Sequence, residues 1–314
     1  TMNWRTKAII QKTLAMLPDC LSYRLYSLMQ KRFGALKRVK PEIRVLMARD
    51  LVQLIELQGV SAEGKTFFEL GTGWFCGTPL GLWLCGAKEV VTVDLNPYLQ
   101  EGLVLQEVTY LVNHSDQISA LFGKHGELSI FRERLNELRR KRPQKLAEVL
   151  SLASIQYWSR FDARRTTLPA RSVDCYFSHY VLQHIPQDSL REILSEARRI
   201  LNPNGLMVHY IDAGDQFSRA DNAITEINFL QFDEATWRRY AGNRYAYHNR
   251  LRASDYLDLI HQAGFTVLTH RSKVDQRSLN ALKAGFLIDT QFQGKPSEDL
   301  ATIGLTVVAR AKIN

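Results

Sequence analysis

Residues 67–96 read FFELGTGWFCGTPLGLWLCGAKEVVTVDLN, and this stretch decides the fold class. A short apolar run is followed by a glycine turn from Gly71 to Gly73, by an apolar segment of helix length, and by a second apolar run that ends at Asp94. The pattern predicts a strand, a tight turn, a helix and a second strand. Glycine lets a backbone approach a ligand closely, and an acid at the end of the second strand accepts hydrogen bonds from ribose hydroxyls. The unit is therefore typical of a site for a cofactor that contains adenosine.

The spacing of the glycines and of one acid favours a particular class of cofactor. The spacing G-x-G-x-x-G is typical of a dinucleotide-binding site. The glycines here are Gly71, Gly73 and Gly77, so the third one comes one position late. Glu69 stands two residues before the first glycine, and a carboxylate there suits a cationic ligand better than a pyrophosphate. The pattern E-x-G-x-G resembles the first motif of the class I S-adenosylmethionine-dependent methyltransferases, whose cofactor carries a sulfonium and an ammonium. Phe75 stands where that family has its third glycine.

Three further segments follow in the order expected from this resemblance. Residues 162–174 are similar to the D-A-x-x-L-P-x-x-S-x-D stretch of the family. An amphipathic helix and a turn at 202–205 are similar to the family's L-x-P-x-G turn before its fifth strand. Residues 254–271 predict a helix capped by Ser254, ended at Gly264 and followed by a strand. The resemblance implies an α/β fold with a Rossmann-like, mostly parallel sheet of seven strands and helices on both faces.

The resemblance also implies how the cofactor is bound. The cofactor would be S-adenosyl-L-methionine, with S-adenosyl-L-homocysteine as the product. Glu69 would meet the ammonium side, directly or through water, Asp94 would take the ribose hydroxyls, and the end of the fourth strand would lie beside the methionine part. Leu95 would pack on the adenine, and Asp162 would meet its amino group. The full set of expected cofactor contacts is Glu69, Gly71, Gly73, Asp94, Leu95, Asp162, Ala163, Ser178 and His179.

Methyl transfer from a sulfonium is an in-line displacement, so the protein must align the nucleophile and often remove a proton. The candidates for a catalytic role are His184, His209 and Asp212. By resemblance, His184 stands where many small-molecule O-methyltransferases carry a general-base histidine, although in other members this histidine shapes the loop. His209 and Asp212 fall at the end of the fifth strand, where they would either bind substrate or satisfy backbone groups. These alternatives stay open.

Length and composition indicate one α/β domain with additional segments. The chain has 314 residues, of which 45 % are hydrophobic and 23 % charged, and this is enough to bury a sizeable core. We expect an N-terminal helical extension at 1–60 and a methyltransferase domain at 61–314, with insertions at about 97–154 and 213–253. The second insertion is rich in aromatic residues and leaves the sheet at the edge where ligands bind, so we expect it to build a substrate pocket.

The net charge and the cysteines limit the classes of binding partner that the sequence predicts. The net charge of +9 indicates either a solvated basic surface or attraction to an anionic partner. No zinc finger, KH loop or RRM signature is present, which disfavours nucleic acid. The sequence has no run of about 20 apolar residues, so we expect no membrane span. By resemblance, the N-terminal helices would cover the cofactor or shape the substrate pocket. The alternatives for these helices are packing at the sheet edge, a homodimer contact or a membrane surface. The four cysteines lack metal-ligand spacing, so we expect no metal, and Cys85 and Cys175 favour a reduced core and a cytoplasmic location.

The sequence therefore predicts an S-adenosylmethionine-dependent methyltransferase that acts by SN2 transfer on an oxygen or nitrogen atom of a small molecule or biosynthetic intermediate. Two alternatives stay open: a methyltransferase acting on nucleic acid or protein, which the charge favours, and a non-catalytic, methyltransferase-like scaffold. The residues SHYV after the fourth strand, in place of N-P-P-Y, argue against methylation of base amino groups. A NAD-dependent oxidoreductase fits the glycine spacing less well.

Overall fold

One sheet of seven strands runs through the computed structural model, which describes residues 2–312 except 35 and 37–39. The strand order is β3-β2-β1-β4-β5-β7-β6. Only β7 runs against its neighbours, so the sheet is otherwise parallel. The strands are β1 (Thr66–Leu70), β2 (Glu89–Asp94), β3 (Ile155–Ser159), β4 (Val173–His179), β5 (Leu201–Asp212), β6 (Phe265–Val274) and β7 (Thr302–Ala311). The predicted mostly parallel, seven-stranded Rossmann-like sheet is confirmed.

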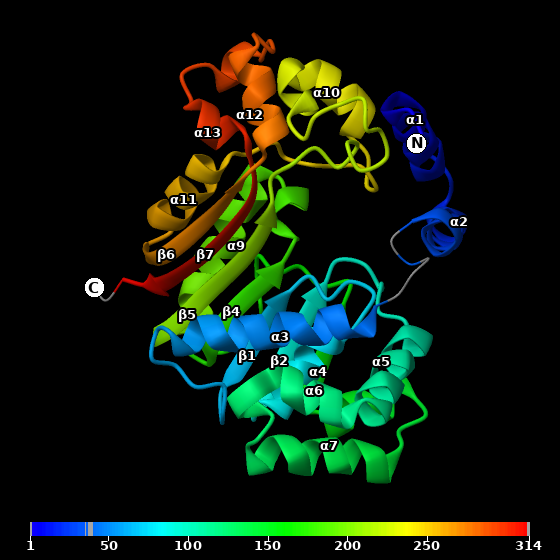
Figure 1. The fold of residues 1–314 in the computed structure, drawn as a ribbon, viewed down its shortest axis with the longest axis vertical. Coiled ribbons are helices and arrows are strands. Elements are labelled where there is room, and N and C mark those ends of the chain that lie inside the picture. Colours follow the sequence, from blue (N-terminus) through cyan, green and yellow to red (C-terminus); the bar gives the residue numbers. More distant parts are fainter. Residues whose placement is uncertain (1, 35, 37–39, 313–314) are drawn as a thin grey trace.

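Helices cover both faces of the sheet, as Figure 1 shows. Successive side chains of a strand point to opposite faces, and Phe67 and Phe68 accordingly belong to two different core clusters. The first cluster includes residues of α3 (Pro41–Glu56), α4 (Gly77–Leu84), α5 (Glu101–Asn113), α6 (Ser115–Phe122), α7 (Ser129–Lys141) and α8 (Leu146–Leu152). The second includes residues of α9 (Gln187–Ile200) and α11 (Ala253–Gln262). The sheet is thus buried on both faces, as parallel sheets require.

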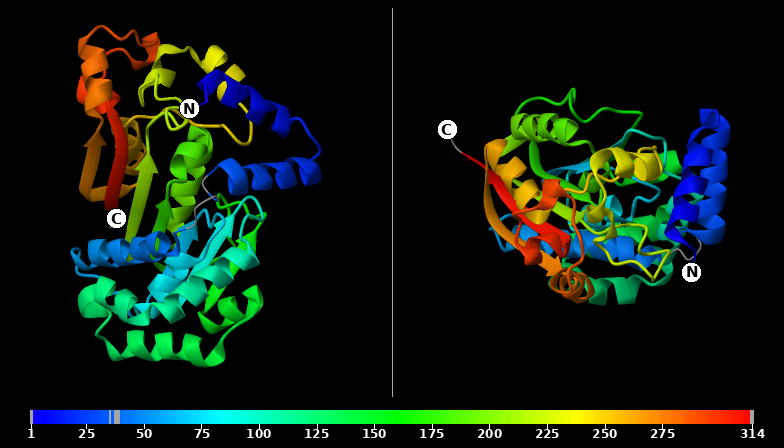
Figure 2. Two further views of the ribbon diagram at one scale, coloured as in Figure 1. Left: turned by 45° about the vertical axis from the view of Figure 1, so that its right-hand side comes forward. Right: turned by 90° about the horizontal axis from the view of Figure 1, so that it is seen from above.

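The N-terminal extension and the second insertion pack on each other above the sheet edge (Figures 1 and 2). The extension begins with α1 (Trp4–Ala15) and α2 (Asp19–Phe33), and α10 (Glu234–Ala241) lies in the insertion. Trp4 of α1 contacts the rings of Phe217, Phe232 and Tyr240. Most of the aromatic residues of the insertion therefore build a third core cluster, which also includes residues from the segment of α12 (Gln276–Lys283) and α13 (Ser297–Leu300).

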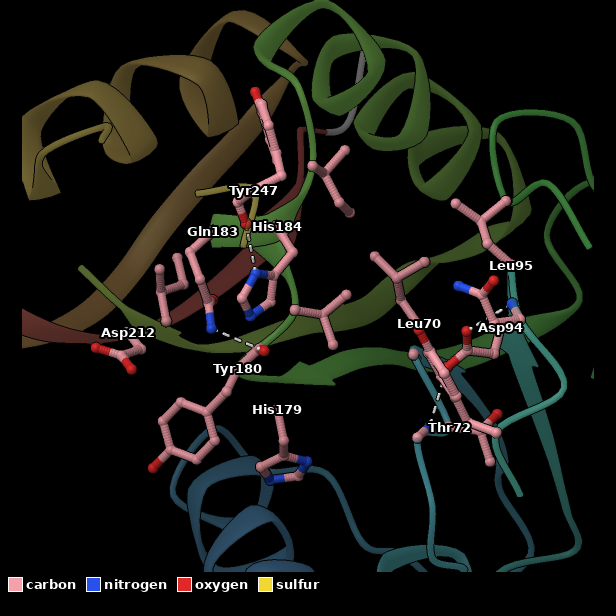
Figure 3. Close-up of a pocket in the computed structure, with 18 of the residues that line it drawn as sticks. Leu70, Thr72, Asp94, Leu95, His179, Tyr180, Gln183, His184, Asp212 and Tyr247 are labelled. Atoms are coloured by element: carbon pink, nitrogen blue, oxygen red, sulfur yellow. Dashed lines mark hydrogen bonds between the residues drawn. The ribbon is translucent and has the colours of Figure 1, made fainter. Parts of the chain in front are cut away.

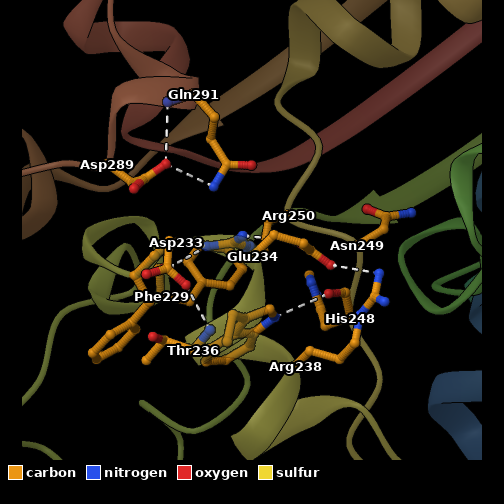
Figure 4. A network of polar contacts seen from close by, with 12 residues as sticks. Phe229, Asp233, Glu234, Thr236, Arg238, His248, Asn249, Arg250, Asp289 and Gln291 are labelled. Atoms are coloured by element: carbon orange, nitrogen blue, oxygen red, sulfur yellow. Dashed lines mark hydrogen bonds and ion pairs between the residues drawn. The ribbon is translucent and has the colours of Figure 1, made fainter.

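A buried arginine fixes the path of the second insertion (Figure 4). Arg250 donates to the carbonyl oxygen of Phe229 at 3.0 Å and pairs with Glu234 at 2.8 Å. Nearby, Trp237 Nε1 donates to the carbonyl oxygen of His248 at 3.3 Å. Because hydrogen bonds to charged groups are strong when water is excluded, this network holds the segment before Arg250 against the rest of the insertion.

Two local predictions are wrong in detail. Helix α11 begins at Ala253 with Arg252 at its N-cap, and Ser254 instead donates to the carboxylate of Asp299 at 2.5 Å. The predicted turn at 202–205 is a bulge within β5, because the strand starts directly after α9 and its register with β4 shifts there. Asn202 holds this bulge by donating to the carboxylate of Asp174 at 3.0 Å.

Across the described residues, every helix is too short or too polar to cross a lipid bilayer.

Candidate active site

A cleft of about 1170 Å³ opens at the carboxyl ends of β1, β2, β4 and β5 (Figure 3). In open α/β sheets this edge is where ligands bind. Ligand pockets commonly hold about 300–1,000 Å³, so the cleft is large enough for a cofactor and a second molecule. Most of its walls come from four regions: the glycine loop 70–74, the segment 93–98, the segment 161–164, and a distal end built from 179–193 and the second insertion. The lining also includes Tyr26, Arg44, Lys273, Ile303 and Gly304.

The glycine loop has the backbone geometry that the sequence predicts. Gly71 and Gly73 have φ of 85° and 65°, which L residues rarely adopt. A Cβ at Gly71 would lie 2.4 Å from Val181 Cγ2, so only glycine lets the loop pass this close to the segment after β4. Gly71 is therefore a close packing contact with Val181, whereas a Cβ at Gly73 would meet nothing within 4 Å.

Asp94 is tied to this loop by its carboxylate. Its two oxygens accept hydrogen bonds from the backbone N–H groups of Gly73, at 3.0 Å, and Asn96, at 2.9 Å. Burial raises the pKa of Asp94, and these two hydrogen bonds oppose the rise. The carboxylate lines the cleft with acceptor capacity to spare, because an ionised carboxyl accepts about four hydrogen bonds. It is placed where ribose hydroxyls would reach it.

Glu69 does not line the cleft. Its side chain is buried, and it accepts a hydrogen bond of 2.6 Å from Thr92, whose hydroxyl lies 2.6 Å from that of Thr72 on the cleft wall. Burial raises the pKa of Glu69 to about 8, so the carboxyl is mostly neutral at pH 7. The expected contact with an ammonium group therefore does not fit this arrangement, and Glu69 reaches the cleft only through the two threonines.

The N-terminus of α4 is occupied by a second buried acid that sequence reasoning missed. Glu107 of α5 accepts a hydrogen bond from the backbone N–H of Cys76 at 2.8 Å, and Gly77 also donates to it. A Cβ at Gly77 would lie 2.5 Å from Glu107 Oε1 and 2.6 Å from Arg44 Cβ. The third glycine of the loop is therefore a packing position for these two side chains. A helix N-terminus filled in this way leaves no room for a pyrophosphate.

At the opposite end of the loop, the expected adenine contacts line the cleft. Leu95 is 67 % exposed at its edge, and Ala163 is buried in its wall. Asp162 also lines the cleft, but both of its oxygens accept hydrogen bonds from the guanidinium of Arg164, at 2.6–3.0 Å, and this hydrogen bonding lowers the pKa of Asp162. An adenine amino group would share this carboxylate with Arg164.

The end of β4 brings one of its two expected residues to the cleft. His179 lines it and stacks on Tyr210 with ring centroids 4.5 Å apart. Burial, with the positive charge of Arg44, lowers the pKa of His179 to about 3, so its ring is neutral. Ser178 points the other way and pairs with His209, Oγ to Nδ1, at 2.7 Å. Both Ser178 and His209 are fully buried and away from the cleft wall.

The predicted contact between His209 and the substrate does not agree with the structure, because His209 does not line the cleft. The sequence suggests that it ends the fifth strand, but β5 continues to Asp212 and His209 pairs with Ser178 and Val307 inside the sheet. Burial lowers the pKa of His209 to about 3. A neutral histidine enclosed in the core has no substrate within reach.

His184 stands on the cleft wall with its tautomer set by the backbone. Its Nδ1 lies 2.9 Å from the carbonyl oxygen of Tyr247 (Figure 3), and because a carbonyl only accepts, this nitrogen carries the hydrogen. Nε2 is left as the acceptor and lies 3.1 Å from the side-chain amide of Gln216. Desolvation lowers the pKa of His184, and the positive charge of Arg219 lowers it further. The hydrogen bond to Tyr247 raises the pKa but does not cancel this decrease. The ring is a neutral acceptor that faces the cleft.

Asp212 lies on the same side of the cleft but is already paired. Its carboxylate forms an ion pair with Arg219 and accepts a hydrogen bond of 3.2 Å from the backbone N–H of Gly214. It thus holds the start of the second insertion. Three further residues of that insertion line the cleft and were not predicted: Gln216, Arg219 and Tyr247. The only signal for them in the sequence is the aromatic richness of the insertion.

The N-terminal helices close the cleft from above. Tyr23 of α2 stacks with Trp74 of the glycine loop and with Tyr98, at centroid distances of 6.0 and 5.6 Å. Tyr26 lines the cleft and stacks on Tyr245 of the insertion at 4.0 Å. One helix therefore bridges the loop of the cofactor end and the insertion of the distal end.

Comparison with known proteins agrees with this architecture. A family model described as a methyltransferase domain matches residues 128–209, which include β3, β4, α9 and most of β5. No curated protein sequence matches the chain. Residues 128–209 of the chain thus match a methyltransferase domain, and they include strands at the centre of a mostly parallel, seven-stranded sheet.

Solved structures of similar fold share little sequence with this chain. One is a candidate sarcosine dimethylglycine methyltransferase from Galdieria sulphuraria, with 13 % identity over 84 % of each chain and a TM-score of 0.47. A second is an S-adenosylmethionine-dependent methyltransferase from Methanosarcina mazei, with 15 % identity over 83 % of this chain and 98 % of that one, and a TM-score of 0.44. A third is the geranyl diphosphate C-methyltransferase of Streptomyces coelicolor, with 12 % identity over 84 % and 76 % and a TM-score of 0.45.

Proposed function

We propose that this protein is an S-adenosylmethionine-dependent methyltransferase that acts on an oxygen or nitrogen atom of a small molecule, and that His184 takes the proton of the acceptor. The observation that carries the proposal is the position of His184 Nε2, an unprotonated acceptor on the wall of the same cleft that holds the glycine loop. An acceptor O–H or N–H that entered the cleft would compete with Gln216 for this nitrogen. A neutral histidine is suited to this role near neutral pH.

The cofactor end of the cleft fits S-adenosyl-L-methionine, which supplies a methyl group already activated on a sulfonium. At Gly73 a Cβ would meet nothing within 4 Å, so the loop leaves open space for a closely approaching ligand, and Asp94 would bind the ribose. Arg44 is the group on the cleft wall best suited to the cofactor carboxylate. Its charge acts on two buried carboxyls, Glu69 and Glu107, whose pKa values burial raises to about 8, so these groups leave the charge of Arg44 largely uncompensated.

Enclosure of the cleft favours a small acceptor over a macromolecule. The stacking of Tyr26 on Tyr245 places α2 across the cleft, between the glycine loop and the insertion. A helix in this position obstructs a folded RNA or protein more than a small molecule. Expulsion of water by such a cover also strengthens the electrostatic contacts inside the site.

The test follows a radiolabelled methyl group. The protein is incubated with S-adenosylmethionine labelled on the methyl group and with a cell extract separated into small molecules, proteins and nucleic acids. We expect label in the small-molecule fraction with the native chain, a strong reduction with His184→Gln, and no reduction with His114→Gln, which changes an exposed histidine outside the cleft.

Other outcomes of this experiment point to the alternatives. Label in the protein or nucleic-acid fraction would replace the small acceptor with a macromolecule. Binding of the cofactor by calorimetry, with no label in any fraction, would support the non-catalytic scaffold.

A further inference from the structure

The outer faces of α1 and α2 carry a repeated pattern that the core does not use. On α1 the exposed stripe consists of Arg5, Ile9, Lys12 and Met16, and on α2 it consists of Leu21, Arg24, Leu28 and Lys31. The spacing of three or four residues places each set on one side of its helix. Apolar and basic residues alternate along both stripes.

In the part of the chain that the structure describes, these apolar side chains lie outside the three core clusters. The inner face of α1 is already occupied by Trp4 and Ala8, and that of α2 by Ser22, Tyr23 and Tyr26. The outer residues remain open to solvent, with exposed fractions of 63 % for Ile9, 79 % for Met16 and 61 % for Leu28. Figure 2 shows both helices at the rim of the molecule in two views.

The charge of this segment has one sign. Residues 1–33 contain six lysines and arginines and a single acid, Asp19. Among the residues that the structure describes, the stripe cations Arg5, Lys12, Arg24 and Lys31 form no ion pair with a carboxylate. The surface therefore presents uncompensated positive charge beside exposed apolar side chains.

We propose that α1 and α2 dock this protein on the surface of an anionic phospholipid bilayer. A helix that lies in the interface needs apolar side chains for the acyl boundary and basic side chains for the headgroups, and the two stripes supply both. Nucleic acid would match the charge but not Ile9, Met16 and Leu28, because a charged phosphate backbone offers no apolar surface to these side chains. A second copy of the chain would bring like charges against one another.

The binding test uses vesicles and matched variants. The full chain is sedimented with vesicles of phosphatidylcholine alone and of phosphatidylcholine with about one-third phosphatidylglycerol, a composition that gives a negative surface. The test variant is Ile9→Glu/Leu28→Glu. The control variant is Leu57→Glu/Leu287→Glu, which changes charge and apolar content equally at two exposed positions outside α1 and α2.

We expect the native chain and the control variant to bind the anionic vesicles and to dissociate as salt rises. The Ile9→Glu/Leu28→Glu variant should lose about tenfold or more in partition coefficient, since it removes buried apolar area and adds repulsion. Because all four substituted side chains are exposed, both variants should keep the melting temperature of the native chain.

Three results would overturn the proposal. The first is a native chain that ignores anionic vesicles, and the second is equal binding by the test variant. The third is a native dimer that Ile9→Glu/Leu28→Glu converts to a monomer while vesicle binding is absent, which would make the stripes a self-association contact. Binding of duplex RNA, but not of vesicles, by the native chain would count against a bilayer in the same way.

Discussion

The carboxylate of Glu107 accepts a hydrogen bond from the backbone N–H of Cys76 at 2.8 Å, and this contact closes the N-terminus of α4 from inside the protein. The first N–H groups of a helix are free to bind an anion, and dinucleotide-binding proteins present them to a pyrophosphate. Here a side chain of α5 takes that place. The contact thus accounts both for the late glycine, Gly77, and for a cofactor without a pyrophosphate.

Removal of this contact should weaken the fold. Glu107→Ala leaves the N–H groups of Cys76 and Gly77 buried without a partner, which should lower the free energy of unfolding by about 1–3 kcal/mol. Urea denaturation measures the change, with Glu133→Ala, at an exposed position on α7, as the control. Equal midpoints for the two variants would mean that Glu107 does not hold the start of α4.

The pH dependence of stability should report the buried carboxyl of Glu69. Its pKa is raised from 4.5 to about 8 by burial, so between these values the folded protein keeps a proton that the unfolded chain has released. Stability from this group is therefore present below pH 4.5 and is lost as pH rises through 8, by at most about 1.4 kcal/mol per pH unit.

Glu69→Gln removes this titration but keeps an oxygen that accepts from Thr92. The stability of the variant relative to the native chain should therefore increase from pH 5 to pH 8 and then level off. Thermal melts at a series of pH values provide the measurement. A difference that stays flat across this range would show that Glu69 is ionised in the folded protein.

The catalytic role of His184 is testable once a labelled acceptor is in hand. If Nε2 takes the proton in the transition state, His184→Ala should lower kcat about 10²–10⁴-fold, while cofactor affinity stays nearly unchanged. Steady-state kinetics and a melting curve must be measured on the same variant, because the bond to Tyr247 also holds the loop.

Asp212→Asn serves as the comparison for His184. It weakens the pair with Arg219 and should affect KM or stability more than kcat. If Asp212→Asn abolishes turnover while His184→Ala retains it, the proton acceptor lies at the end of β5.

How much of the site is visible in the sequence depends on how local each contact is. The glycine turn and Asp94 lie within one β-α-β unit, so their spacing predicts their geometry. Glu107 and Arg44 come from separate helices, and neither periodicity nor motif spacing indicates that they meet at the start of α4. The order of four short motifs predicts the seven-stranded fold because each motif is also a local signal, formed by residues that are close together in the sequence.

His209 and Ser178 show a second limit of sequence reasoning. The sequence places both residues near strand ends, but whether a side chain reaches the cleft depends on how far the strand runs past it and on which face of the sheet it lies. Because β5 runs to Asp212, His209 lies inside the sheet and pairs with Ser178 there. A shift of a single residue along a strand moves a side chain from one face to the other.

The cover formed by α2 should slow the exchange of cofactor. Tyr26→Ala removes the stack on Tyr245, and an aromatic pair contributes about 0.5–1.5 kcal/mol beyond its buried area. The dissociation rate of S-adenosylhomocysteine should rise by about 2- to 12-fold, as measured by stopped-flow displacement. Leu28→Ala, on the outer face of the same helix, should leave this rate unchanged, and an equal rise in both variants would indicate general loosening of α2.

The most direct test of the account is a calorimetric titration of S-adenosylmethionine, or its demethylated product, into the native chain and into Asp94→Ala. The account predicts one site in the native chain, no binding of NADH or ATP at the same concentrations, and a loss of about 1.5–3 kcal/mol in the variant, the range for hydrogen bonds to a charged group. Cofactor at 100 times its Kd should also stabilise the native fold by about 2.7 kcal/mol. Binding of NADH in place of the sulfonium cofactor, or equal affinity in the Asp94 variant, would contradict the site described here.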